Sequence, residues 1–403
     1  MLLNSIKVNG MLSFRDVELE MRPLNVLVGP NASGKSNFIE IMALLQALPR
    51  DLAGFLGSNG GISEWFWKGR RTHNDTSGLV ATLAHPPGSV GLRYSVGLSQ
   101  WGWQPFIEYE RMEYVDSVGH TDNLPFRVVD LNRGIGNLAV WNWNTAGMSD
   151  SPFENYWFQP IGLGELKLNQ SVFSQRRDPS FYPEMTHVGE QMNVIHLYRE
   201  WNMGRKSAIR MPQPTDTPAD ALYEDFSNLA LVLNRLKREP VMPTIEEQLG
   251  RFYETYESLG IDIFANTAQL WIREKGLNNP VPAARLSDGT LRFLALLTIL
   301  CHPHPPPLIC IEEPELGLHP DVIHQVAKLL IEASQRTQII VTTHSAELID
   351  HLWEDPESVV ICERYPDTGT EFNRLKKEEL ESYLERYKLG ELWLHGHIGG
   401  TRF

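Results

Sequence analysis

The sequence predicts an α/β fold, in which a parallel core sheet is combined with an antiparallel β subdomain and a helical insertion. Three patterns indicate it: two strands, a glycine-rich loop and a helix at the start, alternating stretches in the middle, and alternating helices and strands at the end. Helices that alternate with buried strands are typical of a parallel sheet. A chain of 403 residues is long enough for one large domain or for two to three ordinary ones.

The N-terminal part predicts short strands at 5–8 and 16–21, followed by a strand at 24–28. Residues 24–28 are an apolar run, as expected of a strand that is buried on both faces. A glycine-rich loop follows, and residues 37–48 carry apolar side chains at helical spacing until Pro49 ends the helix.

The middle of the chain changes pattern twice. Stretches that begin at Leu79, Gly91 and Phe106 alternate between apolar and polar residues, which predicts an antiparallel sheet with one wet face. Residues 144–165 are rich in serine, proline and glycine and predict a loop. Apolar residues three and four apart then predict three helices, and a strand follows them. These helices are expected at 186–201, 218–239 and 244–259, and the strand at 264–273.

The C-terminal part predicts helices that start near Thr290, Pro320 and Ser345, and strands at 308–311, 338–342 and 358–362. We therefore expect four segments: the N-terminal part of the core, an antiparallel β lobe, a helical insertion and the C-terminal part of the core. Their boundaries are 1–75, 76–165, 166–262 and 263–403.

Composition excludes several classes of protein. The formal net charge of −14 argues against a globally basic nucleic-acid binder. No apolar run reaches the ~18 residues that a membrane-spanning helix needs, and the first residues lack the pattern of a signal peptide. Three cysteines cannot build a disulfide framework. We expect a cytoplasmic protein without a membrane partner.

Residues 29–36, Gly-Pro-Asn-Ala-Ser-Gly-Lys-Ser, fit the pattern G-x-x-x-x-G-K-[ST] in full. Backbone N–H groups of such a loop, and the positive end of the helix after it, hold phosphate oxygens. We expect Lys35 to reach the β- and γ-phosphates and the Ser36 hydroxyl to coordinate Mg²⁺. The other residues expected to line the nucleotide are Asn31, Ser33, Gly34 and Asn37.

A second motif is the apolar strand at 308–311, which runs into Glu312 and Glu313. Acids at the carboxyl edge of a buried strand lie where α/β folds bind their ligands. One acid can hold the shell of a Mg²⁺ ion, and the next can orient or deprotonate the attacking water. Alone, the pattern fits a solvated acidic turn equally well; after a phosphate-binding loop, the catalytic interpretation is favoured.

Two weaker motifs complete the set. Residues 286–290, Leu-Ser-Asp-Gly-Thr, open a helix whose N-terminus can bind phosphate, although Ser-Asp-Gly is also ordinary turn chemistry. His344 follows a buried strand, where a single histidine is more often structural than catalytic. The four motifs are informative together, because they occur in this order and at this spacing along one chain.

In that order the motifs resemble the ABC-type ATPase superfamily. Residues 313–320 and 343–345 resemble its RecF/SMC-related branch, which includes the OLD-like ATPases of bacterial anti-phage and genome-maintenance systems. The resemblance implies that Glu312 helps to hold Mg²⁺, Glu313 activates water and His344 senses the γ-phosphate. It also implies that Ser287 and Gly289 contact ATP held by the opposite subunit. A homodimer, or a higher even oligomer, with 316–320 at its interface is therefore implied.

Two positions depart from the superfamily's pattern. Glu312 stands where aspartate is usual, and the additional methylene moves its carboxylate by ~1.5 Å, which leaves slow hydrolysis open. No glutamine-bearing loop of the superfamily's kind is evident, and we expect a residue between Gly60 and Arg71 to take its place.

Three functions are compatible with these residues. The first is an ATP-hydrolysing dimeric switch that controls a separate nuclease or toxin chain, for example in anti-phage defence, and no fused TOPRIM nuclease pattern follows the histidine. The second is a slow or non-hydrolysing scaffold that sequesters a partner. The third, a RecF-like DNA-repair ATPase, fits the acidic net charge least. The aromatic-rich residues 141–158 offer a possible contact to nucleic acid by stacking on bases, although we favour packing or a protein interface.

Overall fold

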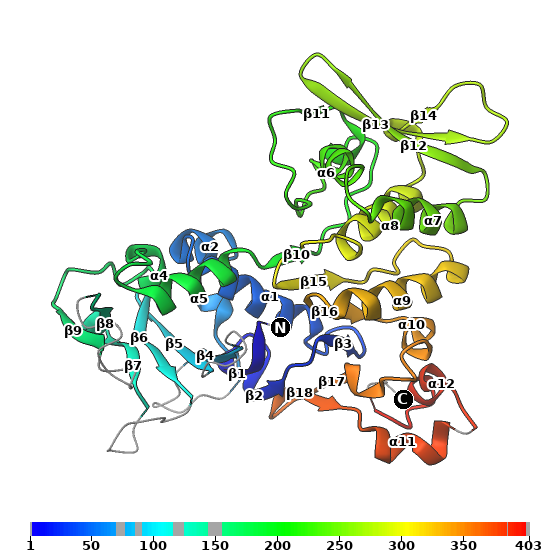
Figure 1. Cartoon of the computed structure of the whole chain (residues 1–403). Coiled ribbons are helices and arrows are strands. Elements are labelled where there is room, and N and C mark those ends of the chain that lie inside the picture. Colours follow the sequence, from blue (N-terminus) through cyan, green and yellow to red (C-terminus); the bar gives the residue numbers. More distant parts are fainter. Residues whose placement is uncertain are drawn as a thin grey trace. The chain divides into compact units, whose positions relative to one another are not determined.

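The computed structural model describes residues 2–69, 77–84, 91–115, 125–143, 155–384 and 386–399. The chain forms two compact units, each assembled from three separate pieces of sequence (Figure 1). The first unit consists of 1–22, 30–195 and 362–373, and the second of 23–29, 196–361 and 374–403. The sequence-based division into four segments stays a prediction.

A parallel sheet forms the centre of the second unit, as the sequence predicts. Its strand order is β10-β15-β16-β3-β17, and every neighbouring pair is parallel. All residues of β3 and β16 are buried, because apolar side chains cover both faces of such a strand. The strands are β3 (Leu24–Val28), β10 (His196–Tyr198), β15 (Leu308–Glu312), β16 (Gln338–Thr343) and β17 (Val359–Tyr365, of which only 359–361 belong to this unit).

The helices expected near residues 290, 320 and 345 are present in this unit. Apolar residues of α9 pack against one face of the sheet, where Val26, Ile309 and Val341 lie. Ser345 begins α10 because its side chain accepts a hydrogen bond from the N–H of Leu348. The helices and 3-10 turns are α8 (Asp288–Leu300), η4 (Pro320–Val322), α9 (Ile323–Ser334), α10 (Ala346–Asp350), η5 (Pro356–Ser358), α11 (Lys377–Leu384) and α12 (Leu389–Leu394).

A small second sheet with its own helices completes the second unit (Figure 1, green to yellow). Within it, α6 and α7 pack between this sheet and α8. The elements are η2 (Ala208–Arg210), β11 (Gln213–Pro214), α6 (Leu229–Leu236), α7 (Met242–Phe252), β12 (Tyr256–Phe264), β13 (Thr267–Glu274), β14 (Val281–Pro282) and η3 (Ala283–Arg285).

The predicted helices at 186–201, 218–239 and 244–259 are wrong in extent. The first ends early because residues 196–198 pair with β15 as β10. The second is shortened to α6 because the Asn228 side chain donates to the carbonyls of Pro218 and Ala221, which holds the preceding residues in turns. The third ends with α7, and β12 starts at Tyr256 where pairing with β13 overrides helical spacing. The strand predicted at 264–273 is β13, shifted by a few residues.

An antiparallel sheet dominates the first unit, as the alternating stretches predict. Its order is β18-β2-β1-β4-β5-β6-β7-β8-β9. The strands are β1 (Leu3–Met11), β2 (Phe14–Glu20), β4 (Ser77–Leu83), β5 (Leu92–Trp101), β6 (Gln104–Tyr114), β7 (Arg127–Asn132), β8 (Ile135–Trp141), β9 (Tyr156–Ile161) and β18 (Gly369–Arg374, whose last residue belongs to the second unit).

The predicted loop at 144–165 is wrong for its second half, because β9 pairs with β8 there; residues 144–154 lie outside the described part. The helices of the first unit include the one predicted after the glycine-rich loop. They are α1 (Lys35–Ala47), α2 (Leu52–Ser58), α3 (Ile62–Trp65), α4 (Val172–Gln175) and α5 (Pro183–Asn193).

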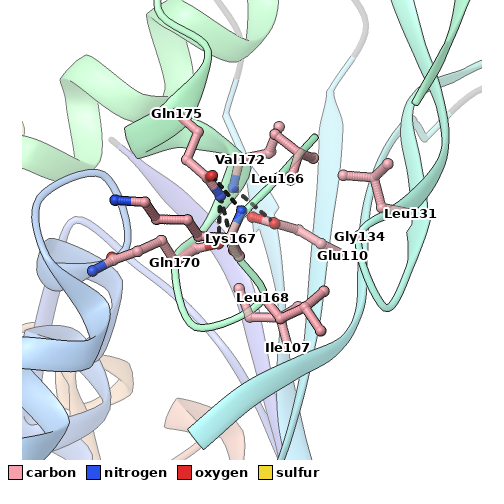
Figure 2. Close-up of a pocket in the computed structure, with 10 residues that line it drawn as sticks. All are labelled: Ile107, Glu110, Leu131, Gly134, Leu166, Lys167, Leu168, Gln170, Val172 and Gln175. Carbon is pink, nitrogen blue, oxygen red and sulfur yellow. Dashed lines mark hydrogen bonds between the residues drawn. The ribbon is translucent and has the colours of Figure 1, made fainter. Parts of the chain in front are cut away.

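A buried carboxylate joins β6 to the start of α4 in this unit. Figure 2 shows Glu110 at a small cavity beside Val172, with the hydrogen bond between them drawn as a dashed line. Glu110 also accepts hydrogen bonds from the hydroxyls of Tyr94 and Ser171. Burial raises the pKa of Glu110, and these three donors offset part of that effect. The carboxyl group therefore serves as an internal cross-link of the β lobe.

Among the described residues, no helix combines the length and the apolar character that crossing a membrane requires.

Candidate functional site

Strands β3, β15 and β16 of the second unit end at the same edge of the parallel sheet. The register pairs Val28 with Thr343 and Glu312 with Thr342, so the residues that follow β3, β15 and β16 leave the sheet side by side. These are the first glycine of the phosphate-binding loop, Glu313 and His344. The carboxyl edge thus brings together motifs from the two ends of the sequence, as expected for a ligand site in a parallel sheet.

Glu313 has an unusual backbone. Its φ is +46°, a left-handed conformation that residues other than glycine rarely adopt. Its N–H donates to the carbonyl of Thr342 at 2.9 Å, which ties the turn to the neighbouring strand. Strain of this kind persists only where surrounding contacts impose it, and it concentrates at functional sites.

The side chains of Glu313 and His344 face one another across this edge. A distance of 3.5 Å separates Oε1 of Glu313 from Nε2 of His344, and each side chain is about one-third exposed. A carboxylate in reach of water can accept a proton, and an imidazole beside it can donate a hydrogen bond to a developing anion. The pair is therefore equipped to activate a water molecule.

Glu315 is a further residue of the site that sequence reasoning did not assign. Its Oε1 accepts hydrogen bonds from the Thr343 hydroxyl and from the N–H of His344, the latter at 3.2 Å. Its Oε2 is buried and has no hydrogen-bond partner within the described residues. Burial raises the pKa of Glu315. The only signal in the sequence is the repeat of the acid two positions after Glu313.

The loop that follows β10 reaches this edge too. Because Tyr198 pairs with Ile311 in parallel, the next residues leave the sheet beside Glu312. Trp201 of this loop donates its indole N–H to the carbonyl of Glu312 at 2.7 Å. The sequence placed the substitute for the missing glutamine loop between Gly60 and Arg71; residues 60–69 belong to the first unit and Arg71 lies outside the described part, so that placement stays a prediction.

Ser287 and Gly289 stand at the start of α8. The Ser287 hydroxyl caps the helix by accepting the N–H of Thr290 at 3.0 Å, and it lies 2.7 Å from the Thr290 hydroxyl. Ser287 is exposed. Gly289 lies against the turn after β15, since a Cβ there would come within 3.1 Å of the Gly317 carbonyl. The first turn of this helix therefore faces solvent at the serine and packs on the turn at the glycine.

The phosphate-binding loop from Pro30 onward belongs to the first unit. Ala32 and Gly34 adopt positive φ values of +65° and +108°, which curl the loop around the N-terminus of α1. No side chain caps α1 and its first turn contains no acid, which leaves that helix end suited to an anion. Lys35 is buried, and its Nζ donates to the Pro30 carbonyl at 3.1 Å.

Thr370 and, through it, Ser13 support this loop by hydrogen bonds, although both are distant from it in sequence. The Thr370 hydroxyl donates to the Ser33 carbonyl at 2.8 Å and lies 2.8 Å from the Ser13 hydroxyl. A Cβ on Gly34 would come within 2.2 Å of that Thr370 oxygen, which explains the glycine. The Ser33 hydroxyl is buried without a hydrogen-bond partner in the described part of the chain. An unmatched buried donor in such a loop fits a phosphate ligand.

The residues expected to hold Mg²⁺ are divided between the units, with Ser36 in the first and Glu312 in the second. The described residues contain no group of three or more His, Cys, Asp or Glu side chains that would hold a metal ion by themselves. Each side chain by its chemistry suits Mg²⁺, because this ion typically takes one or two protein oxygens together with phosphate and water. Asn31, Ser36 and Asn37 are accessible or half-buried.

Comparisons with solved structures show the fold. A crystal structure of the Smc head bound to the C-terminal winged-helix domain of ScpA superposes with a TM-score of 0.51 at 12% identity, covering 94% of this chain and 99% of that one. The Smc head with an extended coiled coil, bound to the C-terminal domain of ScpA from Pyrococcus furiosus, gives 0.51 at 12%, covering 95% and 98%. The fold is therefore that of an Smc-head-like ABC ATPase, and no curated protein matches the chain.

Comparison with protein families gives a closer assignment. The family model described as "AAA domain, putative AbiEii toxin, Type IV TA system" matches residues 24–101 and 161–350, more than half of the chain. This match includes the phosphate-binding loop, both acids at the end of β15 and His344. The OLD-like branch suggested by residues 313–320 is not separately supported. The chain belongs to this AAA-domain family, with an ABC-ATPase head as its fold.

Proposed function

We propose that the protein binds ATP with Mg²⁺ and hydrolyses it, as a homodimer or higher even oligomer in which each nucleotide contacts two chains. The observation that carries this proposal is the Glu313–His344 pair, 3.5 Å apart at the carboxyl edge of the parallel sheet. The strained backbone at Glu313 supports a functional role for it, since a purely structural acid has no need of such strain.

The phosphate-binding loop is proposed to bind the triphosphate of ATP. Lys35 and the N-terminus of α1 bind phosphate oxygens, and Ser36 and Glu312 would hold Mg²⁺. Asn31, Ser33, Gly34 and Asn37 line the nucleotide. When bound, Mg²⁺ neutralises charge that develops on the β- and γ-phosphates. Glu313 takes a proton from the attacking water, and His344 donates a hydrogen bond to the γ-phosphate.

The second contact with each nucleotide is proposed to come from the opposite chain. Ser287 is exposed at the N-terminus of a 13-residue helix, where backbone N–H groups can meet a γ-phosphate. Gly289 allows the helix to approach closely. Leu316, in the turn at 316–320, is 56% exposed, which supports a role of this turn in the dimer interface.

Glu313→Gln tests the hydrolysis step. The amide cannot accept the proton, so kcat is expected to fall about 10²- to 10⁴-fold, while ATP still binds and the dimer accumulates in size-exclusion chromatography. Glu332→Gln is the matched control, because Glu332 pairs with Lys328 on an exposed helix face. Undiminished turnover in Glu313→Gln would reject Glu313 as the base.

We propose that the dimer switch controls a separate toxin or nuclease chain. The family description names a toxin–antitoxin system and applies the word toxin to the AAA-domain family itself, so it supports a partner chain from such a system. The two similar Smc heads are bound to domains of ScpA in their structures, so heads of this fold carry partner proteins. Co-expression with each neighbouring gene product tests this control. The toxicity of the pair to the host cell should differ between the wild type and Glu313→Gln. Equal toxicity in every pairing would contradict control by the nucleotide state.

A nucleotide-dependent scaffold is the second candidate, and Glu312 favours it. Its longer side chain replaces the usual aspartate, and Trp201 fixes its carbonyl, so the backbone cannot shift to offset the additional methylene. Steady-state turnover below about one per hour, far under typical enzyme rates, would support the scaffold over the switch.

A further inference from the structure

The site in the second unit has two halves, the turn at Glu313 and the start of α8 at Ser287. The residues between β10 and α6 contact both of them. We call residues 201–210 the strap. Trp201 lies at one end of it and Arg210, in η2, at the other. The strap belongs to none of the motifs in the sequence, yet its two ends hold the backbone next to Glu313 and next to Ser287.

Trp201 fixes the peptide unit that precedes Glu313. That peptide consists of the Glu312 carbonyl, which accepts the Trp201 indole N–H at 2.7 Å, and the Glu313 N–H, which donates to Thr342 at 2.9 Å. The peptide plane is therefore held at both ends, directly before the residue with the strained φ. The Trp201 ring is itself fixed, since it stacks on Phe226 with the planes 20° apart.

Arg210 holds the peptide unit that precedes Ser287 at its carbonyl end. Its side chain is only 4% exposed. It donates to the Leu286 carbonyl at 2.6 Å, to the Ala283 carbonyl at 3.1 Å and to the carboxylate of Asp288. It also donates to the Met203 carbonyl at 2.7 Å, within the strap. A rigid planar fork suits this arrangement, because several acceptors are held in one geometry.

A second connection runs through α8. Arg292 donates to the Leu316 carbonyl in the turn after β15, and its guanidinium lies 4.8 Å from the centre of the Trp201 ring. Burial lowers the pKa of Arg292 to about 10, while Glu315 and Glu313 act against that change. Arg292 is therefore charged at neutral pH and attracted to the turn that contains the acids.

We propose that the strap couples the two halves of the site, with Trp201 and Arg210 as positioning residues for Glu313 and Ser287. A phosphate that engages Ser287 shifts the peptide held by Arg210, and the strap transmits this shift to the peptide held by Trp201. Hydrolysis then requires that the chain's own Ser287 is engaged. The inference rests on the proposed ATPase function, in which Ser287 binds the nucleotide of the opposite chain.

Trp201→Phe removes the indole N–H and keeps an aromatic ring beside Phe226 and Arg292. We expect kcat about tenfold lower with the KM for ATP changed by less than about twofold, the pattern of a contact that matters only in the transition state. Trp271→Phe is the matched control, because its indole nitrogen is buried with no partner among the described residues. Equal kcat in both variants would overturn the role of Trp201.

Arg210→Lys tests the other end, and the double variant tests the coupling. If both residues act through one strap, kcat of Trp201→Phe/Arg210→Lys falls no further than that of the more affected single variant, within about twofold. Independent residues would multiply their losses, which contradicts the proposal. If Arg210→Lys does not fold, Asp288→Asn is tested in its place. This substitution removes the negative charge that pairs with Arg210, at a side chain that is 73% exposed.

Hydrogen exchange separates this proposal from the proposed ATPase activity, because it needs no turnover. In Trp201→Phe, we expect faster amide exchange at 312–318 and also at 283–290, where the hydrogen bonds of the strap come from Arg210. Arg235→Lys is the control for the arginine variant, since Arg235 pairs with Asp220 on the surface. Exchange that rises only beside the substituted residue would refute the coupling, whether or not the protein hydrolyses ATP.

Discussion

Replacing Thr370 by valine tests whether the phosphate-binding loop is held in place by a residue 337 positions away in the chain. Valine has almost the same shape, so packing against Gly34 is preserved. The backbone bond from the Thr370 N–H to the Ser13 carbonyl, at 2.8 Å, is also preserved. What disappears is the hydroxyl that donates to the Ser33 carbonyl and contacts the Ser13 hydroxyl.

The magnitude follows from the groups left behind. Thr370 is 1% exposed, so the Ser33 carbonyl loses a buried donor that water cannot replace. A buried polar group without its partner costs about 1–3 kcal/mol. If the bond preorganises the loop, about 1 kcal/mol of this cost appears as weaker ATP binding, roughly a fivefold rise in Kd. The remainder appears as lower stability of the first unit.

Fluorescence titration with a labelled ATP analogue measures Kd, and urea unfolding measures stability. Thr298→Val is the matched control, because the Thr298 hydroxyl is buried and bonds to the Leu294 carbonyl of its own helix. An unchanged Kd in Thr370→Val, together with reduced stability, would refute the positioning role and leave a structural one.

Three further predictions concern other residues. Burial raises the pKa of Glu110 above its ordinary value of 4.5, so the folded first unit binds this proton more tightly than the unfolded chain. The stability of the wild type relative to Glu110→Gln should therefore fall as pH rises from about 4 through that raised pKa, and a pH-independent difference in urea unfolding would contradict this. Ser287→Ala removes the cap of α8, at a cost of about 1 kcal/mol, and should abolish ATP-dependent dimerisation in light scattering. Glu315→Ala removes the acceptor for the His344 N–H and should lower kcat about tenfold or more with ATP binding retained; unchanged kcat would show that Glu315 is not needed to hold His344.

The parallel sheet and the four motifs could be predicted from sequence because each has a local signature. Residues 308–311 and 338–342 are apolar runs, and 29–36 match a complete pattern. Once strands are parallel and adjacent, the acids and His344 must leave the same edge. The distance between Glu313 and His344 follows from that arrangement more than from any feature of either residue.

The contacts that support the site could not be predicted, because they join residues without a local pattern. Thr370 lies in a short strand after the last motif, and Arg210 in a turn of the expected helical insertion. β10 was missed because three residues carry too little periodicity to compete with the helical spacing around them, and only pairing with β15 decides their conformation. The φ of Glu313 is likewise imposed by its neighbours.

Complementation between two inactive variants tests most directly whether each ATP site is shared by two chains. Lys35→Ala disables the phosphate grip, and Ser287→Ala disables the contact proposed to act on the opposite chain's ATP. Random pairing of equal amounts makes half of the dimers mixed, each with one intact site, so light scattering should show ATP-dependent mixed dimers although neither variant forms dimers alone. A mixture that dimerises no more than the two separate variants would show that each chain builds its site alone.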